Sequence, residues 1–278
     1  MPPKKKAVKE ETPLSINEQF DERLSVIKAG DTPLLDLFQY ADEYTDLDVV
    51  CQSTGFPSLD ALIHPKLLGA PRGRIIEIFS PEGNVGKSTL TRQIIANWQK
   101  AGLQTALAEP EKTDTRSFWD ELGIVTARNH QTIPAMRIMR PRWDLSTEES
   151  TLYSAEQFLD AILAASQVMD LIVLDSIDAL VKACDLEKDA EDNDTVGGIS
   201  KLLSSFFRKM TNNRATLLAV NQMRYAIGKF SHNGTPMTTT GGKAPSFYAT
   251  VRLMLTRIGT LKEDKEGADP YGFQVQIK

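Results

Sequence analysis

The chain has 278 residues, of which 41% are hydrophobic, and this is long enough to bury a substantial core in one main domain with appendages. No apolar run approaches the roughly 20 residues that span a bilayer, and no secretion signal is evident, so we expect neither a membrane protein nor a secreted one. The net charge of −5 excludes coating of nucleic acid by bulk positive charge, so any DNA site must be a local patch. Cys51 and Cys184 lack metal-ligand spacing and are expected to be reduced thiols.

Residues 1–52 are predicted to be appendages. A disordered tail is expected over 1–14, where a run of three lysines lies between prolines and glutamates. Ser15 and Glu18 have capping-box spacing, and apolar residues then recur at helical intervals as Phe20, Leu24 and Ile27. This pattern predicts a short N-terminal amphipathic helix that ends near Gly30, before an acidic linker. The apolar stripe must be covered by the chain's own core or by a neighbouring subunit, so 15–52 is a possible subunit-docking segment.

From about residue 73 the sequence alternates between short β-rich runs and helical stretches. The predicted strands are 75–79, 105–108, 171–174, 217–220 and 251–255. The predicted helices between them are 88–100, 154–166 and 199–210. Such alternation indicates an α/β fold with a mostly parallel central sheet flanked by helices, and we assign 53–278 to this core.

A phosphate-binding loop is the strongest signal in the sequence. It lies between the first predicted strand and the first predicted helix of the core, and consists of Gly83, Asn84, Val85, Gly86, Lys87, Ser88 and Thr89. Glycines let backbone N–H groups turn towards an anion, and the helix N-terminus adds partial positive charge. Lys87 is expected to reach the β and γ phosphates of ATP, and Ser88 to bind Mg²⁺. Pro81 stands where the pattern has its first glycine.

Carboxylates at the ends of two predicted strands complete a hydrolytic site. Asp175 follows the strand 171–174, where it can hold the water shell of Mg²⁺ opposite Ser88. Hydrolysis also needs a group that orients water against the γ-phosphate, and both Glu109 and Glu111 lie just past the strand 105–108. The residues alone leave the choice between these two glutamates open.

Several separated segments resemble the RecA recombinase family of bacteria and phages, in the same order and at similar spacing. The matching segments are 53–55, 58–60, 71–78, 174–180, 220–228 and 238–249. The most specific are VNQMR at 220–224 and TTTGGKA at 238–244, which a general phosphate-loop enzyme has no reason to carry. The resemblance implies a RecA-like P-loop ATPase core in the cytoplasm.

The resemblance also implies roles for individual residues. Glu111 corresponds to the catalytic carboxylate, Phe118 to an aromatic residue that packs on adenine, and Gln222 to a sensor of the γ-phosphate at the root of a mobile DNA-binding loop, 223–243. Within that loop, Gly241 and Gly242 would let backbone N–H groups approach phosphates, with Arg224 and Lys243 supplying charge.

A first DNA-binding loop is expected between Leu186 and Gly198. Two basic residues on one face of the following helix, Lys201 and Arg208, would contact DNA. The loop and its approach depart from this expectation, because they hold one lysine against six acids: Asp185, Glu187, Asp189, Glu191, Asp192 and Asp194. Either these acids point away from the strand or the loop has another partner.

The leading hypothesis is a DNA-dependent ATPase that uses ATP and Mg²⁺ and forms a helical filament on single-stranded DNA. It would pair that strand with homologous duplex DNA and exchange strands. The runner-up is a RecA-like accessory or regulatory protein that binds ATP without exchanging strands; the acidic first loop favours it, as does the end of the chain at Lys278, beyond which family members continue. A ring-shaped motor would share the phosphate loop but leaves the segment 221–248 unexplained.

Overall fold

The computed structural model describes residues 15–38, 40–43, 48–144, 147, 149–186, 198–225, 237–262 and 270–278. The chain divides into two compact units, 1–49 and 50–278, which we call the first and second units. Across the described ranges no helix combines the length and the apolar character that a membrane crossing needs.

The described part of the first unit begins with the helix α1 (Ile16–Val26), which is followed by the short strands β1 (Lys28–Ala29) and β2 (Thr32–Pro33). The predicted capping box is present, because the Ser15 side chain accepts from the Glu18 N–H and the Glu18 side chain accepts from the Ser15 N–H. The predicted end near Gly30 is wrong. The helix stops at Val26 because β1 pairs with β2 and Gly30 takes a left-handed turn conformation with φ 64°.

Two 3-10 turns complete the described part of the first unit, η1 (Leu34–Asp36) and η2 (Ala41–Glu43). No residue of α1 is buried, and the side chain of Phe20 is 58% exposed. The apolar stripe that the sequence predicts therefore lies exposed on the surface of this unit.

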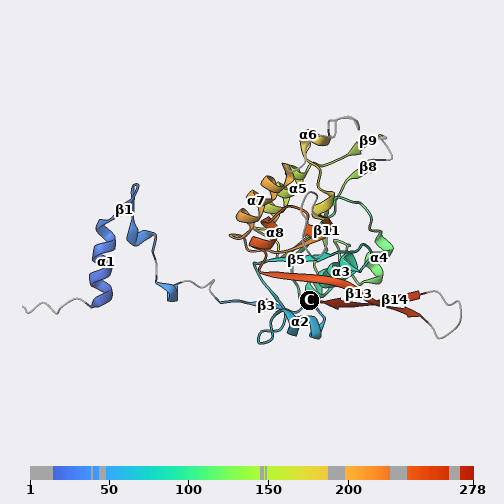
Figure 1. Cartoon of the computed structure of the whole chain (residues 1–278), viewed down its shortest axis with the longest axis horizontal. Coiled ribbons are helices and arrows are strands. Elements are labelled where there is room, and N and C mark those ends of the chain that lie inside the picture. Colours follow the sequence, from blue (N-terminus) through green and yellow to red (C-terminus); the bar gives the residue numbers. More distant parts are fainter. Residues whose placement is uncertain are drawn as a thin grey trace, which may run out of the picture. The chain divides into compact units, whose positions relative to one another are not determined.

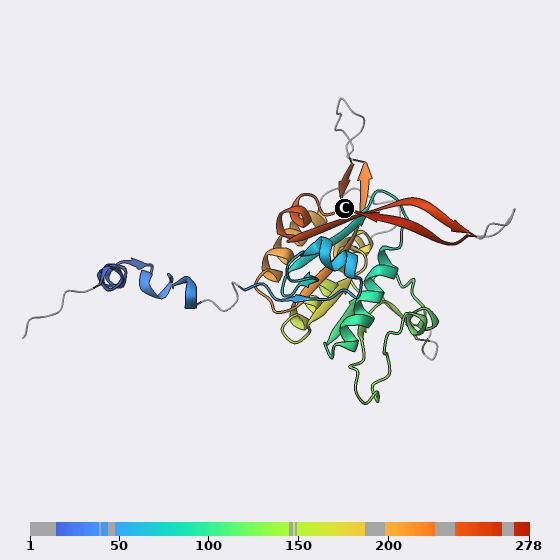
Figure 2. The same cartoon turned by 90° about the horizontal axis from the view of Figure 1, so that it is seen from below.

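The second unit is built on one sheet with the strand order β14-β13-β5-β11-β10-β6-β7. Of these strands, β5, β11, β13 and β14 are labelled in Figure 1. The sheet's parallel strands, from one side to the other, are β13 (Val251–Lys262), β5 (Ile75–Ser80), β11 (Thr216–Tyr225), β10 (Leu171–Leu174), β6 (Thr105–Ala108) and β7 (Arg137–Met139). Two antiparallel strands join them: β14 (Pro270–Ile277) pairs with β13, and β12 (Met237–Thr239) pairs with β11. The hairpin of β13 and β14 extends beyond the body of the unit (Figure 2).

Helices cover both faces of this sheet. Alternate strand residues point to opposite faces, so Ile76 and Ile78 join a core with α3 (Lys87–Lys100), whereas Ile75 joins a second core with α5 (Ala155–Ala165) and α7 (Gly198–Met210). Parallel strands buried on both faces explain the continuous apolar runs in the sequence.

Shorter elements connect these layers. They are β3 (Cys51–Gln52), α2 (Pro57–Ile63), β4 (Ala70–Pro71), α4 (Arg116–Glu121), β8 (Arg142–Asp144), β9 (Glu149–Thr151), η3 (Ile177–Ala179), α6 (Ala183–Leu186) and α8 (Ala244–Tyr248). The predicted α/β fold class, a mostly parallel sheet between helical layers, is confirmed.

Candidate functional site

The predicted phosphate loop connects β5 to α3 at the carboxyl end of the sheet's central strands. Asn84 and Gly86 adopt positive φ angles of 53° and 85°, and Gly86 is the N-cap of α3. The first turn of a helix leaves backbone N–H groups without intrahelical partners, and the first turn of α3 directly follows the loop. This arrangement suits a phosphate, which the helix N-terminus stabilises further through its partial positive charge.

Lys87 is buried at the start of α3, and its Nζ donates to Ser80 Oγ at 2.6 Å. Burial lowers the pKa of Lys87 below its ordinary value, although the nearby charges of Asp175, Asp178 and Glu111 act in the opposite direction. A phosphate beside this ammonium would stabilise its charged form, so the residue fits the ligand that the loop predicts.

A hollow of about 420 Å³, which we call the nucleotide hollow, brings most of the predicted nucleotide residues together. It is lined by the loop residues Asn84, Val85, Gly86, Lys87, Ser88 and Thr89, by Glu111, Thr113 and Asp175, and by Val220, Gln222 and Phe273. Of the predicted set, Gly83 and Phe118 do not line it. Phe118 packs against the core on the α3 side of the sheet, so its contact with adenine stays a prediction. The aromatic side chain in the hollow is Phe273, from β14.

The two candidate glutamates occupy different environments. Glu109 is buried, and its Oε1 accepts from the N–H groups of Thr113 and Asp114 at 2.7 and 2.8 Å. Burial is the main cause that raises its pKa. Glu111 lines the hollow, where its Oε1 accepts from Ser176 Oγ at 2.5 Å. Glu109 therefore stabilises the segment 110–114 through hydrogen bonds from its backbone. Glu111 is the carboxylate with access to a ligand in the hollow.

Asp175, the predicted Mg²⁺ carboxylate, already has a cationic partner. Arg92 of α3 lies 2.8 Å from Asp175 through its Nη1 and 2.6 Å from Asp114 through its Nε. All three side chains are nearly inaccessible to solvent. Ser88 and Asp175 line the same hollow, so a hydroxyl and a carboxylate oxygen, both suitable for Mg²⁺, are available there.

Gln222 links this hollow to the segment that carries the predicted second DNA loop. Its backbone N–H donates to Asp178 Oδ2 at 2.8 Å. The other oxygen of Asp178 accepts from the Thr240 hydroxyl, and lies 3.1 Å from Arg224 Nε. Asp178 therefore fastens both sides of the β11–β12 pair at the point where it leaves the sheet.

Apart from Arg224 on β11, the residues predicted to contact DNA lie on α7 and in the turn before α8. Lys201 and Arg208 are exposed on α7, and Arg208 Nε donates to the Tyr248 hydroxyl at 3.3 Å. Gly241 and Gly242 both have positive φ, and a Cβ at Gly241 would lie 2.7 Å from Leu203 of α7. The positive φ of 93° favours glycine at Gly241, which is buried, whereas Gly242 and Lys243 are exposed. Most of both predicted loops, 187–197 and 226–236, lies outside the described residues.

Sequence reasoning missed several residues of this site, among them Phe273, Asp178 and Arg92. Phe273 gave no signal, because β14 carries no recognisable motif. Asp178 stood inside a matching segment without an assigned role. Arg92 had a usable signal, since it lies one helical turn before the buried Ile95 and Ala96 and therefore had to be buried with them.

Comparison with known proteins shows which family the chain resembles over most of its length. The model of the RecA N-terminal domain matches residues 28–278. The chain is 36% identical over 242 residues to Protein RecA of Clavibacter michiganensis, covering 86% of this chain and 59% of that protein. The corresponding values for Protein RecA of Leifsonia xyli are 37%, 86% and 60%. For Protein RecA of Campylobacter jejuni they are 37% over 216 residues, 76% and 56%. The chain thus spans somewhat more than half the length of these relatives.

Proposed function

Because the chain belongs to the RecA family, we propose that it is an ATP-dependent DNA recombinase. It assembles into filaments on single-stranded DNA, pairs that strand with homologous duplex DNA and exchanges strands in the cytoplasm. The observation that carries this proposal is the convergence of Lys87, Asp175 and Gln222 on one hollow, with Asp178 connecting Gln222 to the predicted DNA loop.

In this proposal the hollow binds ATP with Mg²⁺, which neutralises phosphate charge and makes the γ-phosphate susceptible to water. Lys87 and the N–H groups at the start of α3 hold the phosphates. Ser88 and Asp175 hold the Mg²⁺ side of the site. Glu111 orients the attacking water, and Ser176 fixes the carboxylate by donating to it. Each of these groups lies on a different element, and the sheet brings them together.

DNA binding is coupled to the nucleotide through the β11–β12 pair. Gln222 senses the γ-phosphate from inside the hollow, while Asp178 and Thr240 tie its backbone to the returning strand. Lys201, Arg208, Arg224, Gly242 and Lys243 contact the phosphates of the single strand. Arg224 would then exchange its ion pair with Asp178 for a DNA phosphate. This exchange breaks one of the contacts that hold the β11–β12 pair to Asp178.

Self-association in this proposal uses residues 15–52 as a docking segment. The apolar residues of α1 are exposed within that unit, and a neighbouring subunit is one of the two surfaces able to cover them. A filament forms on DNA if each subunit makes this same contact with the next subunit along the DNA strand.

Electron microscopy tests the proposal against its runner-up, an ATP-binding accessory protein without strand-exchange activity. The protein is mixed with single-stranded DNA and a slowly hydrolysed ATP analogue. Continuous helical filaments support the recombinase, and a Lys87→Ala variant should form none. Discrete particles from the parent protein would favour the accessory function, which the acidic residues of the first loop also favour.

A further inference from the structure

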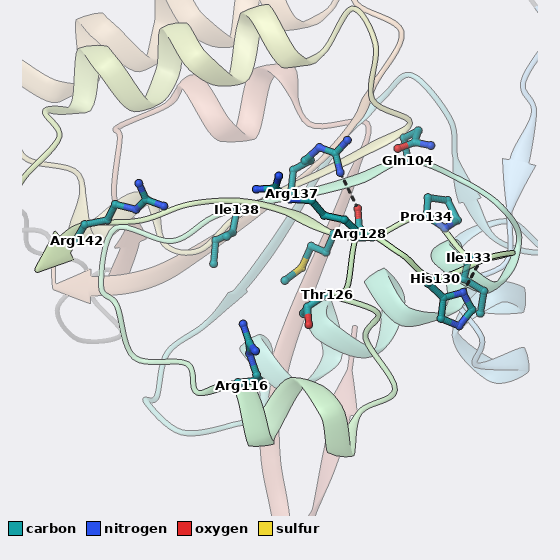
Figure 3. Close-up of a pocket in the computed structure, with 12 residues that line it drawn as sticks. Gln104, Arg116, Thr126, Arg128, His130, Ile133, Pro134, Arg137, Ile138 and Arg142 are labelled. Carbon is teal, nitrogen blue, oxygen red and sulfur yellow. Dashed lines mark hydrogen bonds between the residues drawn. The ribbon is translucent and has the colours of Figure 1, made fainter. Parts of the chain in front are cut away.

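The arginines of the second unit differ widely in what surrounds them. Four of them line a second hollow at the β7 edge of the sheet, which shares no lining residue with the nucleotide hollow: Arg116, Arg128, Arg137 and Arg142. This second hollow has a volume of about 810 Å³, and its described lining contains no acidic residue (Figure 3). Arg92 is the opposite case, because its side chain is buried and contacts two carboxylates. Its guanidinium therefore has a fixed place in the structure.

Arg92 holds its two carboxylates through different nitrogens. Its Nε donates to Asp114 Oδ2 at 2.6 Å, and its Nη1 donates to Asp175 Oδ2 at 2.8 Å. A guanidinium is planar and rigid, so these two contacts set the distance between the two carboxylates. Among the described residues no donor binds Asp175 Oδ1, and Asp175 lines the nucleotide hollow. Arg92 thus binds one oxygen of Asp175 and leaves the other to the hollow.

Asp114 extends this constraint to the segment that carries Glu111. The N–H of Asp114 donates to Glu109 Oε1 at 2.8 Å, and its Oδ2 also accepts from the Trp119 indole N–H at 2.7 Å. Glu111 lies three residues before Asp114, and its own Oε1 accepts from Ser176 Oγ at 2.5 Å. Glu111 is therefore held through its backbone on one side and through its carboxylate on the other.

These contacts close a ring around Arg92. Ser176 directly follows Asp175 in the chain and donates to Glu111. From Glu111 the chain runs on to Asp114, which accepts from Arg92. The ring thus contains both carboxylates that the proposed hydrolysis needs, Asp175 and Glu111, and one buried cation determines how far apart the two sides of the ring lie.

We propose that Arg92 is a positioning residue for ATP hydrolysis. The inference rests on the proposed function, in which Asp175 holds the Mg²⁺ side of the site and Glu111 orients water. Arg92 does not line the nucleotide hollow, so it acts by fixing the two carboxylates relative to each other. A displacement of about 1 Å at a reacting centre can cost about 10²-fold in rate. Partners that orient a metal ligand are worth about 10- to 100-fold in metal affinity or activity.

Arg92→Lys tests this role, because lysine keeps the charge but has a single nitrogen and cannot hold both carboxylates. Arg72→Lys is the matched control, since Arg72 contacts the buried Asp170 at the opposite end of β10 from Asp175. Hydrolysis of ATP is measured with single-stranded DNA, at a temperature at which circular dichroism shows every variant folded. In Arg92→Lys kcat should fall about 10- to 100-fold while KM stays close to the parent's. Arg72→Lys should hydrolyse ATP like the parent.

Binding of a fluorescent ATP analogue gives a second measurement, which needs no turnover. The analogue is titrated with Mg²⁺ and with EDTA, and the gain in affinity that Mg²⁺ brings should shrink about tenfold in Arg92→Lys. Asp114→Ala opens the ring on the other side of Arg92 and leaves Arg92 and Asp175 as a neutral pair. This variant should lower kcat and keep the Mg²⁺ gain. Asp114→Asn should lose less of kcat, because its amide oxygen can still accept from Arg92 Nε.

The inference is overturned if Arg92→Lys matches Arg72→Lys in both kcat and the Mg²⁺ gain, because Arg92 would then serve the stability of the fold alone. A raised KM with an unchanged kcat in Arg92→Lys also contradicts it, since Arg92 would then act on nucleotide binding. Should Arg92→Lys fail to fold, Asp114→Ala decides, and a parental kcat in that variant rejects the positioning of Glu111.

The parent protein separates this inference from the proposed function. A parent that shows neither the Mg²⁺ gain nor hydrolysis contradicts the proposed function, and the role of Arg92 with it. A parent that shows both, beside an Arg92→Lys variant that behaves like Arg72→Lys, contradicts the role of Arg92 alone.

Discussion

Arg92 Nη1 lies 2.8 Å from Asp175 Oδ2, so the carboxylate at the end of β10 is held by a buried arginine on the helix that follows the phosphate loop. The same guanidinium holds Asp114, which also accepts from the Trp119 indole N–H at 2.7 Å. One buried cation therefore joins Asp175, the proposed Mg²⁺ ligand, to the segment that carries Glu111. A charge placed between two buried carboxylates fixes their positions, and its removal leaves both without compensation.

The first prediction concerns this buried arginine. Arg92→Leu should lower the free energy of unfolding by about 3–5 kcal/mol, because two buried aspartates lose their common cation. Arg92→Lys should lose less, since it keeps the charge while giving up the second contact. Urea unfolding at pH 7 measures both, with Arg128→Leu at an exposed position as the control. An unfolding free energy equal to the parent's in Arg92→Leu would show that the two carboxylates tolerate each other without the arginine.

Lys87→Ala should bind ATP much more weakly and lose nucleotide-dependent binding to single-stranded DNA. Its ammonium is buried beside the phosphate loop, and its removal leaves phosphate charge without compensation. Titration with a fluorescent ATP analogue measures the affinity, and Lys100→Ala at the exposed end of α3 provides the control. Equal affinity for the analogue in Lys87→Ala and the parent would contradict the assigned role.

Glu111→Gln should keep ATP binding and lose about 10² to 10⁴ in the rate of hydrolysis, because the amide keeps the shape of the side chain and cannot act as a base. Phosphate release in the presence of single-stranded DNA measures the rate. Glu121→Gln, at an exposed position of α4, is the control. Turnover at the parental level would remove Glu111 from the mechanism.

Asp170 makes stability depend on pH. Burial acts to raise its pKa, but hydrogen bonds from Arg214 and the Gln104 N–H, with the charge of Arg72, hold that pKa below its ordinary value. The carboxylate therefore stabilises the fold above the ordinary aspartate pKa of about 4, and this contribution is lost as the pH falls through the depressed pKa. Asp170→Asn should cost about 1.5–3 kcal/mol at pH 7.

Urea unfolding of Asp170→Asn at pH 7 and at successively lower pH checks both parts of this expectation. The difference from the parent should shrink as the pH falls below about 4. Asp160→Asn, at an exposed position of α5, should resemble the parent throughout. A difference that stays constant with pH would mean that shape, and not charge, gives Asp170 its effect.

The central strands could be predicted from the sequence because burial on both faces leaves continuous apolar runs. The bounds of β6 and β10 agree with those predicted, since turn residues end each run. The extension of β11 to Tyr225 was missed because its second half is polar and pairs with β12 at the edge of the core. The edge strands β7 and β14 were missed for a similar reason, since each pairs on one side alone and needs no strong apolar signal.

The nucleotide hollow likewise has a part that the sequence predicted and a part that it did not. Its loop residues are consecutive, so the local motif predicted them. The contact of Arg92 with Asp175 joins residues 83 positions apart and depends on how α3 lies across the sheet, which no local pattern encodes. The arginines of the second hollow come from separate segments for the same reason, and none has a motif of its own.

Gln222 lies between the nucleotide hollow and the strand pair that leads into the predicted DNA loop. Its side chain lines the nucleotide hollow, and its backbone N–H is held by Asp178, which also accepts from Thr240 across the β11–β12 pair. A change in the position of Gln222 would therefore be transmitted to both strands that lead into the predicted DNA loop. Binding of ATP and of DNA should then bias the same two-state element, and such coupling is reciprocal.

Gln222→Ala should still bind ATP, but ATP should no longer raise its affinity for single-stranded DNA. The coupling lost should be about 1–3 kcal/mol, and the effect of DNA on ATP affinity should fall by the same amount. Asp178→Asn should weaken the coupling as well, because a neutral amide is a poorer acceptor for the Gln222 N–H and loses the ion pair with Arg224. Single-strand affinity is measured with ADP and with a slowly hydrolysed ATP analogue for both variants, the parent and the exposed control Gln167→Ala. If the ratio of the two affinities in Gln222→Ala equals that of the parent, Gln222 is a strand residue without a switching role, and the coupling must run through another part of the hollow.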